Sequence, residues 1–114
     1  MGAGVLYDMI EIKDGSVIIS YLDNPWLSKV LNTDSMIPTF DYGDCLITEA
    51  PINLKVGDIV IWQRKLGEPL SCHRIVRIKD NWVQTKGDHN WFSDKWFPIT
   101  DVRYRVKGII YREG

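Results

Sequence analysis

Residues 70–85 decide the fold, and they read LSCHRIVRIKDNWVQT. Two apolar, β-branched runs flank Asp80-Asn81, which is typical of a tight turn between antiparallel strands. Because side chains alternate along a strand, His73, Ile75 and Arg77 are expected to share one face of the first run. The stretch therefore predicts a β-hairpin with a histidine in the middle of its first strand.

Short strands separated by turns extend from this hairpin to both ends of the chain. Further strands are predicted at residues 7–12, 17–21, 45–48, 59–63 and 102–111, with Gly, Asp, Asn and Pro between them. Residues 1–31 read as an N-terminal β-hairpin, turning at Asp14-Gly15, and a connector in which residues 26–31 form a helical turn or an irregular strand. No repeat or linker divides the sequence. We expect an all-β fold of coiled antiparallel sheets, with at most short helical turns, in a single domain spanning residues 1–114.

Composition and charge narrow the range of functions. The chain has 114 residues, 45% hydrophobic and 25% charged, which suits one globular core. Its net charge of −1 gives no indication of a nucleic-acid partner, and none is expected. No apolar run approaches the roughly 20 residues that span a bilayer, and the N-terminus lacks the features of a signal peptide. The sequence predicts either a soluble protein or a domain whose membrane anchor lies elsewhere.

The two cysteines, Cys45 and Cys72, are expected to be small buried hydrophobic residues. Two are too few for a disulfide scaffold, and their spacing does not suit a metal site, so no metal or cofactor is predicted. A Cys72 nucleophile acting with His73 is the alternative. It is disfavoured because adjacent residues on a strand point to opposite faces.

Four other side chains supply the groups needed for hydrolysis: Ser35, His73, Asp88 and Asp94. A serine hydroxyl becomes a nucleophile when a base takes its proton, and a carboxylate can hold that base in the correct tautomer. Pro38 restricts the backbone just after Ser35, whose amide is then a candidate oxyanion donor. We therefore expect Ser35 and His73 to lie within hydrogen-bonding reach, with Asp88 or Asp94 at the other imidazole nitrogen.

The order of four sequence blocks resembles type I signal peptidases. The similarity is to the branch found in archaea, the endoplasmic reticulum and some Gram-positive bacteria, which uses a histidine where the common bacterial enzymes use a lysine. The blocks are Ser35-Met36-Ile37-Pro38, Gly57-Asp58-Ile59-Val60, His73-Arg74-Ile75-Val76, and Lys86-Gly87-Asp88-His89-Asn90 with Asp94. Each block alone is weak, but four in the same order make chance unlikely. The resemblance covers residues 33–108, roughly two-thirds of the chain.

The resemblance implies a membrane-associated serine endopeptidase that removes leader peptides after small residues. It assigns Ser35 as nucleophile, His73 as general base, and Asp88 or Asp94 as the acid. We expect the substrate to bind as an extended strand beside the segment that leads into Ser35, and membrane association would come from an anchor or partner outside this sequence. One departure stands out: the family usually has glycine before the serine, where this chain has Asp34, whose charge would oppose a developing oxyanion.

Two rival functions share the same fold. Self-cleaving repressors of the LexA type are soluble and cut an Ala-Gly bond upstream of the serine, and Ala3-Gly4 lies at a similar distance from Ser35 here. Those proteins use a lysine base, however, which disfavours this alternative. The other rival is a catalytically inactive, binding-only domain.

The two acids and the aromatic residues near them also allow alternatives. We favour Asp94 as the residue that orients His73, with Asp88 supporting the loop or pairing with Arg74. His89 is expected to be exposed and incidental. The aromatic side chains near Asp94 are expected to form a small separate core that braces the Asp94 loop, and an exposed apolar rim is the alternative. These aromatic residues are Trp82, Trp91, Phe92, Trp96 and Phe97.

Overall fold

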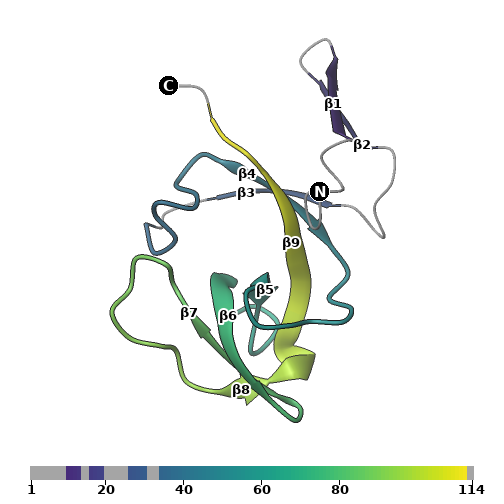
Figure 1. Cartoon of the computed structure of the whole chain (residues 1–114). Coiled ribbons are helices and arrows are strands. Elements are labelled where there is room, and N and C mark those ends of the chain that lie inside the picture. Colours follow the sequence, from purple (N-terminus) through teal and green to yellow (C-terminus); the bar gives the residue numbers. More distant parts are fainter. Residues whose placement is uncertain (1–9, 14–15, 20–25, 31–33, 113–114) are drawn as a thin grey trace.

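The computed structural model describes residues 10–13, 16–19, 26–30 and 34–112, and β-strands dominate them (Figure 1). In the described part of the chain the helical structure is a single 3₁₀ turn, η2 (Ile99–Asp101). Every strand pairing is antiparallel. The prediction of an all-β fold of antiparallel strands is therefore confirmed.

The strands form two sheets. The smaller sheet is the predicted N-terminal hairpin of β1 (Ile10–Lys13) and β2 (Ser16–Ile19), whose Asp14-Gly15 turn lies outside the described residues. The larger sheet has seven strands in the spatial order β3-β4-β9-β5-β6-β7-β8. Their bounds are β3 (Trp26–Lys29), β4 (Cys45–Glu49), β5 (Ile59–Trp62), β6 (Ser71–Lys79), β7 (Trp82–Lys86), β8 (Phe97–Pro98) and β9 (Val102–Ile110). Of the two alternatives expected for residues 26–31, a helical turn or an irregular strand, the structure forms the strand, β3.

Breaks in register bend the large sheet, and β9 runs across its whole height (Figure 1). They occur in the β4–β9, β5–β9 and β6–β7 pairings. Such bulges increase the local twist and let a sheet coil on itself. The bulge in β6 also corrects one expectation. Ile75 pairs with Thr85 but Arg77 pairs with Gln84, so Ile75 and Arg77 lie on opposite faces instead of sharing one.

Both faces of β5 are buried, which explains its uninterrupted apolar sequence. Ile59 and Ile61 belong to one core cluster with Met36, and Val60 belongs to a second cluster with Ile75. The first cluster lies under the segment that carries Ser35, and the second lies under the middle of β6. The segment that carries Ser35 and the strand that carries His73 are therefore each attached directly to the core.

Strand β6 has an unpaired edge at its beginning. Its first residues, Ser71 to His73, pair with β5 on one side, whereas pairing with β7 on the other side begins only at Arg74. Among the described residues, no strand continues the sheet beyond this three-residue edge.

Candidate active site

His73 lies between Ser35 and Asp94. Its Nε2 atom is 3.0 Å from the Ser35 Oγ, and its Nδ1 atom is 2.6 Å from the Asp94 Oδ2. An ionised carboxylate only accepts hydrogen bonds, so Nδ1–H donates to Asp94 and Nε2 is left to accept from the serine hydroxyl. The predicted contact of Ser35 with His73 is confirmed, and so is the approach of a carboxylate to the other ring nitrogen.

Ser35 is held by its neighbours in the sequence and by the loop after β7. Met36 is completely buried in the first core cluster. The Ser35 carbonyl accepts a hydrogen bond of 2.8 Å from the His89 amide. Gly87 makes this contact possible, because a Cβ atom there would lie only 2.7 Å from the Ser35 carbonyl oxygen. The glycine in the Lys-Gly-Asp block thus allows two backbone segments to approach closely.

Asp94 is fixed to strand β7 by hydrogen bonds. Its amide donates to the Thr85 carbonyl at 2.7 Å, and its Oδ2 accepts from the Thr85 Oγ1 at 2.6 Å. The Gln84 side chain adds a bond of 3.1 Å to the Asp94 carbonyl. The carboxylate side chain keeps 25% of its surface exposed, and His73 keeps 15%, so the pair is shielded but reachable.

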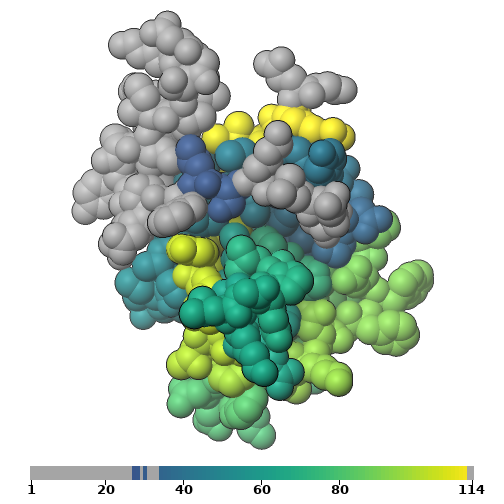
Figure 2. All heavy atoms as spheres, turned by 180° about the vertical axis from the view of Figure 1, so that it is seen from behind, coloured from purple at the N-terminus to yellow at the C-terminus, as the bar shows by residue number. Residues whose placement is uncertain are grey.

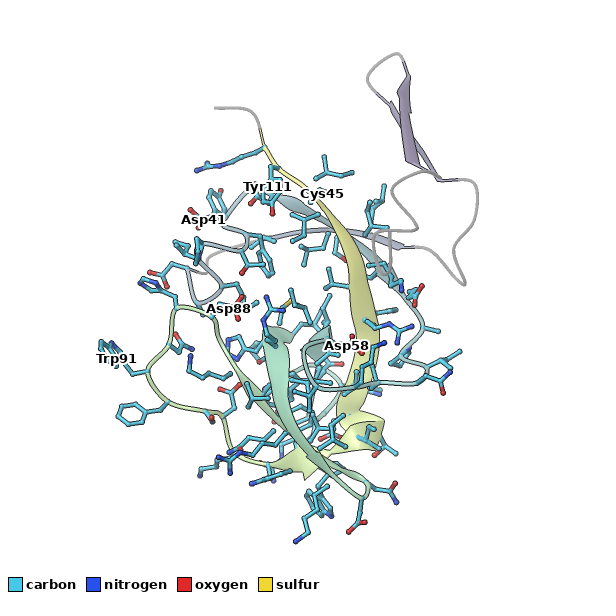
Figure 3. All side chains as sticks on the ribbon, viewed as in Figure 1. Asp41, Cys45, Asp58, Asp88, Trp91 and Tyr111 are labelled. Atoms are coloured by element: carbon cyan, nitrogen blue, oxygen red, sulfur yellow. The ribbon has the colours of Figure 1, made fainter. Side chains whose placement is uncertain are left out.

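The aromatic residues do not brace this loop, which corrects the prediction of a small separate core. Trp91 and Phe92 are 92% and 84% exposed, and Trp82 and Trp96 are also exposed. Only Phe97 of the five is buried. Trp91 points away from the body of the protein (Figure 3), and the loop after β7 projects at the rim seen in Figure 2. Hydrogen bonds to Thr85 and Gln84 already anchor Asp94, so the loop needs no apolar support.

Asp88 has a different set of partners. Its carboxylate forms a bidentate ion pair with Arg74, in which Nε donates to Oδ1 at 2.9 Å and Nη2 donates to Oδ2 at 2.8 Å. The carboxylate also accepts a hydrogen bond from the Thr39 hydroxyl. Arg74 also donates to the Gly57 carbonyl. Asp88 therefore ties β6 to the turn that follows Ser35, as expected for the supporting acid.

The partners of this ion pair shift each other's ionisation. The hydrogen bonds from Arg74 hold the pKa of Asp88 below its usual value, and the Thr39 hydrogen bond acts in the same direction. The bond to Asp88 correspondingly raises the pKa of Arg74. Both groups are charged at neutral pH.

Cys72, the alternative nucleophile, is unsuited to attack a substrate. Burial, with a smaller contribution from the charge of Asp88, raises the pKa of the Cys72 thiol to about 12. Cys72 is then essentially all thiol at neutral pH, which disfavours it as a nucleophile. Both cysteines are free and only partly buried, and Cys72 packs against the first core cluster. His89 and Asp34 are exposed, as expected for His89.

Three residues that hydrogen-bond to Asp88 or Asp94 were not predicted from the sequence: Thr39, Gln84 and Thr85. A threonine or glutamine in a strand or a turn is ordinary, so the residue types give no signal for a supporting role. Thr85 could have been found from register, because it directly precedes the Lys-Gly-Asp block and β7 was expected beside β6.

The described residues contain no helix long and apolar enough to cross a membrane, and no group of His, Cys, Asp and Glu that could hold a metal ion. Comparison with known proteins finds no matching family, no matching curated protein and no matching solved structure.

Proposed function

We propose that this protein is a serine endopeptidase resembling the Ser-His branch of signal peptidase I. The observation that carries the proposal is the continuous hydrogen-bonded chain from Ser35 through His73 to Asp94. A nucleophile, a base and an orienting acid in this order are what acyl transfer at a serine requires. The similarity of the four sequence blocks to signal peptidases adds independent support and indicates a peptide bond as the substrate.

The proposed reaction proceeds through an acyl-enzyme. Ser35 Oγ attacks the peptide carbonyl carbon while His73 Nε2 takes its proton, and Asp94 stabilises the imidazolium that forms. The imidazolium then gives this proton to the leaving amine, and the C–N bond breaks. Water attacks the resulting ester with His73 again as base, which releases the acid and regenerates Ser35. We assign the Ser35 amide as one donor to the oxyanion.

The segment that leads into Ser35, beside which the substrate was expected to add, lies mostly outside the described residues. The unpaired edge of β6 is also suited to an extended substrate. Residues 71–73 have a strand partner only on the β5 side, and the edge ends at His73 itself. A peptide that adds to such an edge gains backbone hydrogen bonds that do not depend on its sequence. Its carbonyl would be brought next to Ser35 and His73, as attack requires.

Peptides with alanine before the scissile bond are expected to be cleaved at least about 10-fold faster than matched peptides with leucine. A site that accepts only small side chains rejects the larger one sterically, and pocket contacts of this size change rates by about 10- to 200-fold. The comparison requires kcat/KM for two peptides that differ only at this residue. Equal values would contradict selection for small residues.

A serine-directed fluorophosphonate tests the proposed function directly. We expect the wild-type protein to gain the mass of one phosphonyl group on Ser35, while Ser35→Ala gains none. Ser93→Ala is the matched control, because it removes an exposed serine close to Asp94 in the sequence and should label like wild type. An unlabelled wild type that is folded would leave the binding-only alternative in place.

The self-cleaving alternative makes a separate prediction about mass. Its bond, Ala3-Gly4, lies outside the described residues. Incubation of the pure protein at mildly alkaline pH would then remove residues 1–3 at a rate independent of concentration. We expect the intact mass to stay unchanged, because His73 is hydrogen-bonded to Ser35 here, whereas the self-cleaving repressors use a lysine base.

A further inference from the structure

One oxygen of Asp94 receives two hydrogen bonds. Oδ2 lies 2.6 Å from the His73 Nδ1 and 2.6 Å from the Thr85 Oγ1. Thr85 is completely buried and stands opposite Ile75 in the β6–β7 pairing. The hydroxyl therefore reaches Asp94 from inside the sheet, while the imidazole reaches it from strand β6.

In its contact with Asp94, the Thr85 hydroxyl can act only as the hydrogen-bond donor. An ionised carboxylate has no proton to give, so the hydroxyl is the donor. A charge-assisted hydrogen bond of this length is among the stronger ones in proteins. The backbone bond from the Asp94 amide to the Thr85 carbonyl already fixes the start of the side chain. The hydrogen bond from the Thr85 hydroxyl then sets the side-chain torsion angles of Asp94, and so the direction of its carboxylate.

We propose that Thr85 is a positioning residue of the active site, which aims the Asp94 carboxylate at the Nδ1 atom of His73. The role rests on the proposed function, because it acts on catalysis only if His73 is the base. With the hydroxyl absent, the carboxylate can rotate toward solvent, to which a quarter of its surface is open. The imidazole then loses the partner that holds its reactive tautomer.

A buried threonine in a strand can instead contribute only to packing in the core. Two substitutions distinguish this packing role from the positioning of Asp94. Thr85→Val keeps the volume and the branched shape but removes the donor. Thr85→Ser keeps the donor but removes a methyl group from the core, which costs stability. A core role therefore predicts that serine is the more harmful change, whereas a positioning role predicts that valine is the more harmful change to turnover.

The experiment measures kcat and KM on a cleaved peptide, and the melting temperature, for both variants. We expect Thr85→Val to lower kcat about 10- to 100-fold with little change in KM, since hydrogen bonds to charged groups have that weight. Thr85→Ser should retain kcat within a few-fold while melting at a lower temperature. The matched control is Thr48→Val, a fully buried threonine on β4, which should leave kcat unchanged.

Two results would overturn the positioning role: wild-type kcat in Thr85→Val, or an equal loss of kcat in Thr85→Ser. A readout without turnover separates this from failure of the proposed function. The Nδ1 proton of His73, assigned by its absence in His73→Ala, should give a downfield NMR resonance that persists in Thr85→Ser and shifts or disappears in Thr85→Val. If the wild type neither cleaves nor labels, the proposed function is wrong, and an unchanged resonance in Thr85→Val would independently reject the role of Thr85.

Discussion

His73→Ala is expected to lower kcat/KM by about 10⁴-fold or more, whereas His89→Ala should leave it within a few-fold of wild type. The chain has two histidines, and only His73 contacts the Ser35 hydroxyl. His73→Ala removes the base whose Nε2 atom lies 3.0 Å from the Ser35 Oγ. His89 contributes its backbone amide to the Ser35 carbonyl, a contact that alanine retains.

Peptide cleavage by the purified variants provides the measurement, and phosphonate labelling rates provide a second one. If His89→Ala were the inactive variant and His73→Ala the active one, His73 could not be the base.

Asp94→Asn is expected to lower turnover by about 10⁴-fold with a small change in melting temperature. The asparagine amide can present its N–H₂ group to Nδ1, which favours the tautomer whose proton lies on Nε2. That tautomer cannot accept the proton of Ser35. The amide nitrogen of the new side chain takes the place of Oδ2, so its second N–H can donate to the Thr85 hydroxyl oxygen. The backbone bond from the residue 94 amide to the Thr85 carbonyl is unchanged, so the loop keeps its anchor.

Asp88→Asn is the matched comparison and should mainly reduce stability. It weakens the ion pair with Arg74 and the hydrogen bond with Thr39, at a cost of about 1–3 kcal/mol in the free energy of unfolding. For a chain of this length the melting temperature then falls by on the order of 5 °C. The reverse outcome, a stable but inactive Asp88→Asn and an active Asp94→Asn, would assign the triad to Asp88.

The contribution of Asp88 should also depend on pH in a defined direction. Its pKa is lowered in the folded protein, so folding favours the charged carboxylate. The resulting stabilisation is complete above the unfolded-state value of about 3.9 and is lost as the pH falls through the folded-state value. The difference in melting temperature between wild type and Asp88→Asn should therefore be widest near pH 7 and narrow below about pH 4. An equal difference at both ends would exclude the charge as its source.

Local sequence signals were sufficient for most of the fold. Turn residues such as Asp80-Asn81 and Gly67 interrupt β-branched runs, so strands β4 to β7 and β9 were predicted to within a residue or two. The register breaks were not predictable, because a bulge such as that after Ile75 depends on how two distant strands fit together. That bulge is why Arg77 lies on the opposite face from the expected one.

The residues that form the candidate site were easier to predict from the sequence than the residues that hold them in place. Ser35, His73 and Asp94 stand in recognisable blocks, and the structure brings them together as expected. Thr85 was missed because its role depends on the path of the loop that returns Asp94 to β7, whereas the hairpin register gives only its position opposite Ile75. Trp91 and Phe92 were misjudged because a dense aromatic cluster normally indicates burial, while here hydrogen bonds hold the loop instead.

The unpaired edge of β6 is short, and its length limits how long a peptide can stay bound there. Three residues offer only a few backbone hydrogen bonds, and the edge ends where β7 begins to pair at Arg74. Under the proposed function, a cleaved product held by so few bonds would dissociate quickly, which would leave the site free for another peptide. The same limit discourages two copies from joining edge to edge, because open strands promote aggregation only when they are long enough to pair.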